Sequence, residues 1–286
     1  MRVRAFAVAF GSGLLALLPA LALAQTPRSA LKICQDPNNL PFANAAGQGF
    51  ENRIAELMGQ AMNLPVTYYN FPNRLAFVRN TLRYKLPDED YPCDLILGVP
   101  QGFDQVATTQ PYYRSSFVAL LPKGSPWDSV HNSAELAGLL QDASQANLRI
   151  GVMDRSPAST WLGKHGLDKL GVPYQLMNPN ADQAPWVPLT QDLQANKLNL
   201  AILWGPIAAQ VVQQDGRFRV LPMVSENGVK FDFSIAMGLR YGEPAWKQEV
   251  QAALDAEQEA IKQVLTQAGV PLLPLASASA AAPSKP

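Results

Sequence analysis

The chain has few of the residues that metal binding and catalysis most often use. It holds 2 cysteines and 2 histidines in 286 residues, which nearly excludes a zinc site built from these residue types. Its 23 basic side chains are balanced by 23 acidic ones, so it lacks the basic surplus of a nucleic-acid-binding protein. It contains no G-x-S-x-G elbow, P-loop, G-x-G-x-x-G fingerprint or Cys-x-x-Cys-His haem motif. Nothing in it supports an enzyme or an electron carrier with a cofactor of its own.

One long apolar run is present, close to the first residue. Arg2 and Arg4 precede an apolar stretch from Ala5 to Leu21, and residues 22–24 read Ala-Leu-Ala. This order predicts a secretory signal peptide over residues 1–24, cleaved after Ala24, and a periplasmic mature protein of formal charge −2, with 21 basic and 23 acidic side chains. The alternative, a membrane anchor, is weakened by the glycines and the proline inside the run and by its short length.

Export changes the interpretation of the two cysteines. In an oxidising compartment, two cysteines favour a disulfide over a redox or metal site. Cys34 ends one apolar run and Cys93 begins another, and adjacent strands would bring them within bridging distance. The bond would close a loop of about 60 residues and contribute about 4 kcal/mol. Two free thiols remain the alternative.

Strand and helix patterns alternate from Leu31 to about Val270, which predicts an α/β fold with helices covering a parallel sheet. The expected strands are 31–35, 65–69, 94–99, 116–121, 149–152, 174–177, 199–203, 219–224 and 231–239. The expected helices are 50–62, 73–83, 157–170, 189–195, 206–214 and 243–267. Residues 272–286 are mostly Ala, Ser and Pro with no face to bury, and we expect them to be disordered.

Three segments in this order resemble the bilobal extracellular solute-binding proteins of periplasmic transport systems (family 3). They are Gly49-Phe50-Glu51 at a helix start, the strand at 94–98 followed by Pro111-Tyr112-Tyr113, and Arg149-Ile150-Gly151-Val152. The resemblance implies a type II periplasmic-binding fold, with two three-layer α/β lobes joined by a two-strand hinge. Lobe one is then expected at 31–121 and 225–271, and lobe two at 122–224.

A narrower resemblance lies in the runs at 36–42, 49–57, 77–82, 108–115 and Trp204-Gly205-Pro206. These segments resemble the quinoprotein-dehydrogenase-associated branch, which includes the J proteins encoded with methanol dehydrogenases and their c-type cytochromes. What this implies is a non-catalytic periplasmic accessory whose partner is a dehydrogenase dependent on pyrroloquinoline quinone (PQQ), or its cytochrome. The alternative is the substrate-binding component of an ABC-type transporter for a small non-amino-acid solute. Fold similarity alone does not decide between them.

The amino-acid clamp of the wider family is not found. Amino-acid-binding relatives hold the ligand carboxylate with an Arg shortly before the Pro-Tyr-Tyr segment and its amine with an Asp late in lobe two. Here no Arg or Lys occurs between Gly98 and Pro111, and the second position reads Leu203-Trp204-Gly205. A zwitterionic ligand is therefore not expected, and Phe42, Tyr112 and Trp204 predict an apolar, aromatic cleft.

Four more cleft candidates carry polar side chains. Asp36 and Asn39 follow the first strand, where the ligand crevice of an open α/β sheet lies, although both could serve only the turn. Arg155 and Ser156 precede a helix and could bind an anion, although capping by Ser156 explains them equally well. We also predict that Arg74 faces the crevice, with solvent as the alternative.

The segment at 83–92 is longer than a helix-to-strand turn needs, and it carries Asp88, Glu89 and Asp90. The simple interpretation is a solvated loop. The more specific hypothesis is a docking loop for a basic partner such as a cytochrome.

Overall fold

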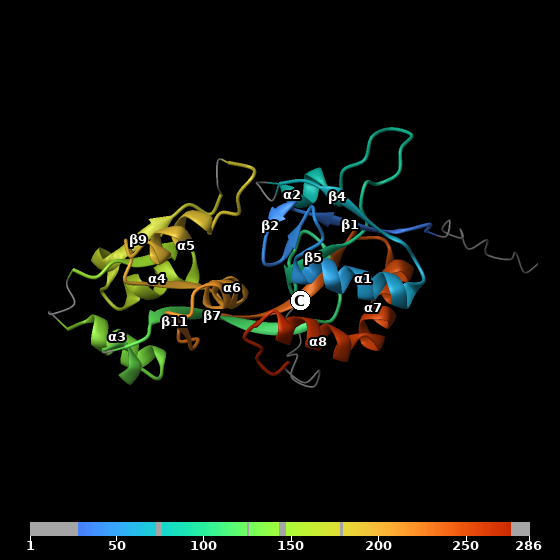
Figure 1. Cartoon of the computed structure of the whole chain (residues 1–286). Helices are drawn as coiled ribbons and strands as arrows, with labels where there is room; N and C mark the ends of the chain where they lie inside the picture. The colour runs from blue at the N-terminus through green and yellow to red at the C-terminus, as the bar shows by residue number, and fades with distance from the viewer. Residues whose placement is uncertain (1–27, 73–75, 125, 143–146, 178–179, 276–286) are drawn as a thin grey trace, which may run out of the picture.

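The computed structural model describes residues 28–72, 76–124, 126–142, 147–177 and 180–275. Two lobes lie side by side and are joined by long strands (Figure 1). The predicted signal peptide, Arg74 and the last eleven residues of the tail fall outside the described residues. Two lobes of mixed α/β structure agree with the expected fold class.

The first lobe is built around β1 (Leu31–Gln35), α1 (Phe50–Met62) and β4 (Val66–Asn70). β1 pairs in parallel with β4, and Ile33 forms a parallel bridge with Leu95, just before β5 (Ile96–Pro100). The apolar face of α1, with Ile54 and Met58 fully buried, packs on this core. The parallel β-α-β order therefore follows from the alternating pattern of the sequence.

The second lobe repeats the alternation. β8 (Ile150–Met153) lies between β9 (Gly171–Tyr174) and β10 (Leu200–Trp204), with both pairs parallel. Its helices are α3 (Ser133–Leu140), α4 (Pro157–Lys164), α5 (Val187–Gln194) and α6 (Gly205–Gln214). The remaining short elements of the chain are β2 (Asn38–Asn39), β3 (Ala43–Asn44), α2 (Phe77–Asn80), β6 (Ala107–Thr108), η1 (Trp127–Ser129), η3 (Asp168–Leu170) and β11 (Phe218–Pro222).

β7 (Tyr113–Pro122) connects the lobes. Its first part pairs with β12 (Asp232–Leu239), with Tyr113 opposite Ile235 and Ser116 opposite Asp232. Its second part pairs with β10 and β11 in the other lobe. One continuous strand therefore belongs to both sheets, and with the return of the chain before β12 it forms the connection about which the lobes can move.

The end of the chain differs from expectation in two ways. The helix expected over 243–267 is divided into α7 (Pro244–Ala256) and α8 (Gln258–Gln267), because Glu257 leaves helical geometry with φ −101° and ψ 8°. The tail expected to be disordered from residue 272 is still ordered at its start. Leu273 forms an antiparallel bridge with Arg114, because an edge of β7 is open there. The tail therefore packs against the hinge before it leaves the described residues.

Three other boundaries are shorter or shifted. α4 ends at Lys164 rather than near Leu170, and Gly166 follows at φ 68°. β9 begins at Gly171, three residues before the strand expected at 174–177. In the helix expected over 73–83, the described part is only α2, and Thr81 at its end leaves helical geometry with φ −125°.

The disulfide prediction is confirmed. Cys34 and Cys93 are bonded, with Cα atoms 5.2 Å apart. Cys34 lies at the end of β1, and its backbone N–H donates to the carbonyl of Leu95. The parallel contact between these segments is therefore what brings the two sulfur atoms together.

Candidate functional site

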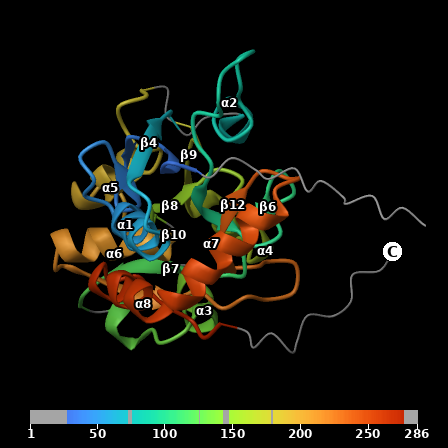
Figure 2. The ribbon, with the colours of Figure 1, turned by 90° about the vertical axis from the view of Figure 1, so that its right-hand side faces the viewer.

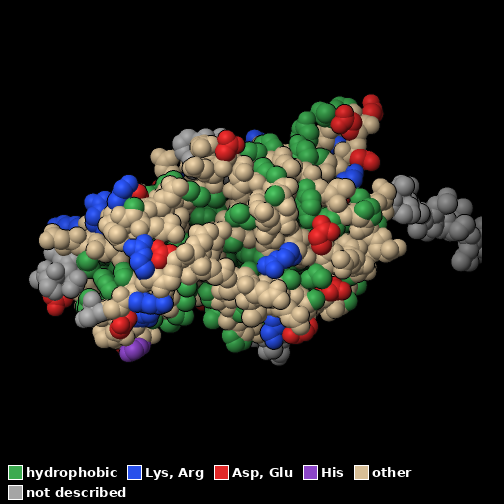
Figure 3. All heavy atoms as spheres, viewed as in Figure 1, with side chains coloured by type: hydrophobic (Ala, Val, Ile, Leu, Met, Phe, Trp, Pro, Cys, Tyr) green, Lys and Arg blue, Asp and Glu red, His purple; other side chains and the backbone are tan. Residues whose placement is uncertain are grey.

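A cavity of about 670 Å³ lies between the two lobes, at the ends of β1, β5, β8 and β10. Its walls are largely apolar, and Figure 3 shows apolar side chains in the hollow between the lobes. The aromatic residues that line it are Phe77, Phe103, Phe117, Trp186 and Trp204. The polar residues that line it are Gln35, Asp36, Asn39, Glu51, Gln105, Arg155 and Ser156. Its position and size are those of a small-molecule or cofactor site in an α/β protein.

Five of the residues predicted from the sequence line this cavity: Asp36, Asn39, Arg155, Ser156 and Trp204. Phe42 and Tyr112 are not among the described residues that line it. Tyr112 is buried, and its hydroxyl accepts a hydrogen bond from the backbone N–H of Gly98 at 3.1 Å. The cavity thus gathers most of the predicted set, while a binding role for each residue stays a prediction.

The polar candidates also have local structural roles, which are the alternatives to ligand binding. The carboxylate of Asp36 accepts from the backbone N–H of Asn38 at 2.9 Å, as in an Asx turn. Ser156 caps α4 by accepting from the N–H of Ser159 at 3.4 Å. Arg155 has its side chain 76% exposed and pairs with Asp154 at 3.5 Å. The guanidinium therefore lies in solvent at the rim, already neutralised in part.

A hydrogen bond and an aromatic contact between described residues cross the cleft between the lobes. The side-chain amide of Asn38 donates to the carbonyl of Ala181 at 3.2 Å. The ring of Phe42 meets that of Trp186 edge-on, with centroids 5.6 Å apart. These contacts hold the two lobes against each other on one side of the cavity.

Glu51 is a cavity residue that the sequence analysis did not select. It occupies the first turn of α1, where an acidic side chain ordinarily signals only a favourable helix dipole. In the structure its carboxyl lines the cavity beside Gly98, where a Cβ would lie only 2.3 Å from Glu51 Oε1. Burial raises the pKa of the carboxyl from 4.5 to about 8. The one sequence feature that could have identified Glu51 as a site residue is its position in the Gly49-Phe50-Glu51 motif.

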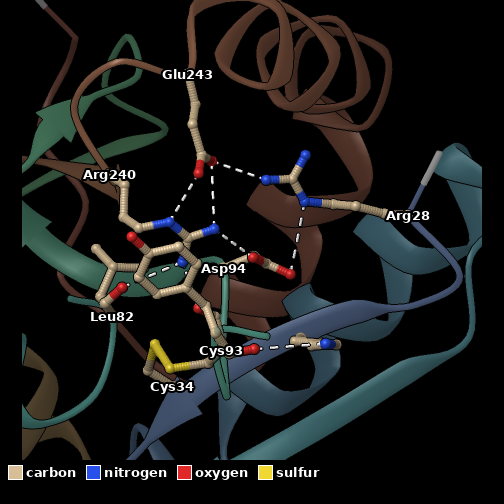
Figure 4. Close-up of polar contacts among 9 residues, drawn as sticks. Arg28, Cys34, Leu82, Cys93, Asp94, Arg240 and Glu243 are labelled. Carbon is tan, nitrogen blue, oxygen red and sulfur yellow. Dashed lines mark hydrogen bonds and ion pairs between the residues drawn. A yellow bond between two sulfur atoms is a disulfide. The ribbon is translucent and has the colours of Figure 1, made fainter. Parts of the chain in front are cut away.

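The loop at 83–92 projects from the first lobe (Figures 1 and 2), and its acidic side chains are exposed. Its two ends are held by Arg240, whose side chain is 7% exposed. One guanidinium nitrogen donates to the carbonyls of Leu82 at 3.1 Å and Cys93 at 2.6 Å, and the group lies over the ring of Tyr91 at 4.0 Å (Figure 4). The disulfide between Cys34 and Cys93 anchors the second end of the same loop.

The charge of Arg240 is balanced by a partly buried network of charged side chains. Asp94 and Glu243 accept from its guanidinium, and Arg28 bridges both acids, at 3.6 Å to Asp94 and 2.8 Å to Glu243 (Figure 4). Two cations therefore alternate with two anions, which satisfies charges that would be costly to bury alone. The network fixes the base of the loop while its tip stays in solvent.

Among the described residues, no group of three or more His, Cys, Asp or Glu is placed to hold a metal ion. No helix within that part is long and apolar enough to cross a membrane.

The bilobal fold, the two-lobe connection and the interlobe cavity define a type II periplasmic-binding protein. A periplasmic binding protein XoxJ from Methylobacterium extorquens AM1 shares 30% sequence identity, covers 86% of this chain and all of that chain, and superposes with a TM-score of 0.68. The chain therefore belongs to the family of XoxJ and MoxJ periplasmic binding proteins.

Other relatives agree. Protein MoxJ of Paracoccus denitrificans is 26% identical over 92% of this chain and 96% of its own length. The structure of MxaJ from Methlophaga aminisulfidivorans MPT is 21% identical, covers 85% of this chain and all of that chain, and has a TM-score of 0.70, which shows the fold. No family model matches the chain. The description of XoxJ as periplasmic agrees with the export expected here.

Proposed function

We propose that this protein is a non-catalytic periplasmic accessory of a PQQ-dependent alcohol or methanol dehydrogenase, and that it assists maturation, cofactor loading or assembly of the enzyme. The observation that carries the proposal is the relationship to XoxJ over 86% of this chain and the whole of that one. The proposed partner is inferred from the resemblance to J proteins, which are encoded with methanol dehydrogenases and their cytochromes.

The cavity supports a role other than amino-acid capture. Among the described residues that line it, the basic side chain is that of Arg155, which is exposed and paired with Asp154. A ligand carboxylate would need a buried guanidinium fork, and none of these residues supplies one. An amino-acid zwitterion therefore fits this cleft poorly.

The mature protein is proposed to act in the periplasm after removal of residues 1–24. Its partner would be the dehydrogenase, its apo form or its c-type cytochrome, and the protein would need no cofactor of its own. The projecting loop at 83–92 is the proposed contact for a basic cytochrome, because its acidic tip is exposed while its base is fixed.

A second candidate function, the receptor of a transporter, is favoured by the cavity itself. Its volume of about 670 Å³ suits a small ligand, and polar groups from both lobes converge on it. Calorimetry with alcohols, aldehydes, small acids and PQQ separates the two functions, because a solute receptor should bind one of them with micromolar or tighter affinity.

The test is a strain that lacks the protein. We expect its dehydrogenase to be recovered in lower yield or without PQQ, and the loss to be reversed by the full chain but not by residues 25–286 expressed without the leader. Recovery of active, PQQ-loaded enzyme at full yield from the deletion strain would exclude the accessory function.

A further inference from the structure

The carboxyl of Glu51 is an unusual group for the wall of an aromatic cavity. It projects from the first turn of α1 beside Gly98 of β5, at a distance that leaves no room for a side chain at that glycine. Among the described residues, no side chain forms a hydrogen bond or an ion pair with it. The missing side chain at Gly98 therefore makes room for the carboxyl itself, which lines the cavity, and none of the described residues pairs a cation with it.

The groups around Glu51 do not satisfy its charge. Tyr112 and Tyr113, from the start of β7, are the titratable groups near enough for their charge to affect it, and both are neutral phenols whose pKa is raised by burial. Asp36 and Arg155 line the same cavity from the loops after β1 and β8. Arg155 is exposed at the rim and already paired with Asp154, so it does not neutralise Glu51.

We propose that Glu51 forms a cation subsite of the interlobe cavity and binds the head of an organic ammonium or guanidinium group. Glu51 is half-buried, and a carboxylate that loses water without gaining a partner is costly, whereas a cation bound to it recovers the lost interaction. The aromatic rings of Phe117 and Trp204 in the same cavity suit such a cation, because ring faces attract positive charge. The head comes from a free organic cation or from a lysine or arginine side chain of a partner.

Binding at this subsite is coupled to proton release. Free Glu51 holds its proton at neutral pH, and a cation displaces that proton when the carboxylate forms. Affinity should therefore rise about tenfold per pH unit below pH 8 and level off above it. A neutral ligand that only fills the cavity would show neither the proton release nor the slope.

The test is isothermal titration calorimetry of the full mature protein with benzylammonium, against benzyl alcohol and benzoate of similar shape. Phosphate and MOPS buffers, which differ in ionisation enthalpy and contain no primary ammonium group, report the protons released. We expect benzylammonium to bind at least tenfold more tightly than either analogue at pH 8, with release of about one proton at pH 7.

The matched variants are Glu51→Gln and Glu56→Gln. Glutamine reproduces the shape of the protonated carboxyl, and Glu56 lies on the same helix but is exposed outside this cavity. The first variant should lose the preference for benzylammonium, and the second should keep it. The pH slope of the wild-type protein is a second readout that needs no variant.

N-acetyl-lysine amide separates the two sources of the cation. If it binds with the same dependence on Glu51, a protein side chain can reach the subsite; if only benzylammonium does, the ligand is a free cation. Benzylammonium binding no tighter than benzyl alcohol, or a preference unchanged in Glu51→Gln, would overturn the subsite. The inference does not rest on the proposed dehydrogenase partner, so the two can fail separately.

Discussion

Phe42 and Trp186 meet edge-on across the cleft, with ring centroids 5.6 Å apart, although one follows β1 in the first lobe and the other opens α5 in the second. Phe42 also packs on Phe50, at 5.3 Å, so it joins the core of α1 to the opposite lobe. The pair is a contact between lobes that a hinge motion must break.

The first prediction concerns this contact. Phe42→Ala should favour a more open arrangement of the lobes, because an aromatic pair contributes about 0.5–1.5 kcal/mol beyond its buried area. Small-angle X-ray scattering should show a larger radius of gyration. Phe71→Ala, which removes a ring packed against Phe77 in the first lobe, should leave the radius unchanged. An equal radius in both variants would contradict the contact's role.

The second prediction concerns the disulfide. Replacement of Cys34 and Cys93 by serine should lower the free energy of unfolding by about 2–5 kcal/mol, because the bond restricts the unfolded chain. Urea unfolding of the oxidised wild type, the reduced wild type and the double variant measures it. The reduced wild type and the serine double variant should have the same free energy of unfolding. A double variant as stable as the oxidised wild type would contradict the prediction.

The third prediction concerns the buried charges. Arg240→Ala should cost about 3–5 kcal/mol of stability, because Asp94 and Glu243 would lose a cation that neutralises them in the interior. Lys262→Ala removes an exposed ion pair with Glu259 and should change stability little. Thermal and urea unfolding compare the two variants. Limited proteolysis at 83–92 should also increase for Arg240→Ala.

The fourth prediction follows from the raised pKa of Glu51. The folded state keeps this proton up to about pH 8, whereas the unfolded chain loses it near pH 4.5. Stability relative to Glu51→Gln is therefore retained below pH 4.5 and should fall by about 1.4 kcal/mol per pH unit as pH rises toward 8. Urea unfolding from pH 4 to 9 measures this, with Glu56→Gln as the control. Parallel curves for wild type and Glu51→Gln would contradict the pKa shift.

The fifth prediction concerns the projecting loop. Changing Asp88, Glu89 and Asp90 to their amides should slow association with the proposed partner cytochrome at low salt, and the difference should disappear at high salt. Stopped-flow kinetics provide the measurement. The matched control neutralises Asp255, Glu257 and Glu259 near the junction of α7 and α8. An equal loss in both variants would indicate net charge rather than the loop.

The sequence predicted the fold well where local pattern and tertiary structure agree. Apolar spacing located α1 at its observed bounds, and β1 likewise. The break between α7 and α8 was not predicted, because Trp246, Val250, Ile261 and Leu265 keep helical spacing across it and are all buried. Leu273 is ordered because it pairs with Arg114 of β7. The two residues are far apart in the sequence, so no local sequence pattern predicts this pairing.

The site was predicted in outline. The rule that ligands lie beyond the carboxyl ends of strands predicted Asp36 and Asn39 at the crevice. Arg155 was predicted from a helix start and Trp204 from an aromatic cleft, and all four residues line the cavity. Glu51 was missed because its position on α1 matched the ordinary preference for an acid at a helix start. Only the three-dimensional structure shows that this carboxyl lies against Gly98 and lines the cavity.

The most direct test of the proposed accessory function is native mass spectrometry of the protein isolated gently from its own periplasm. The function predicts a complex that contains a quinoprotein dehydrogenase subunit or its cytochrome. A protein that appears without either subunit, and with a small molecule of defined mass in the cleft, would contradict it and identify a solute receptor.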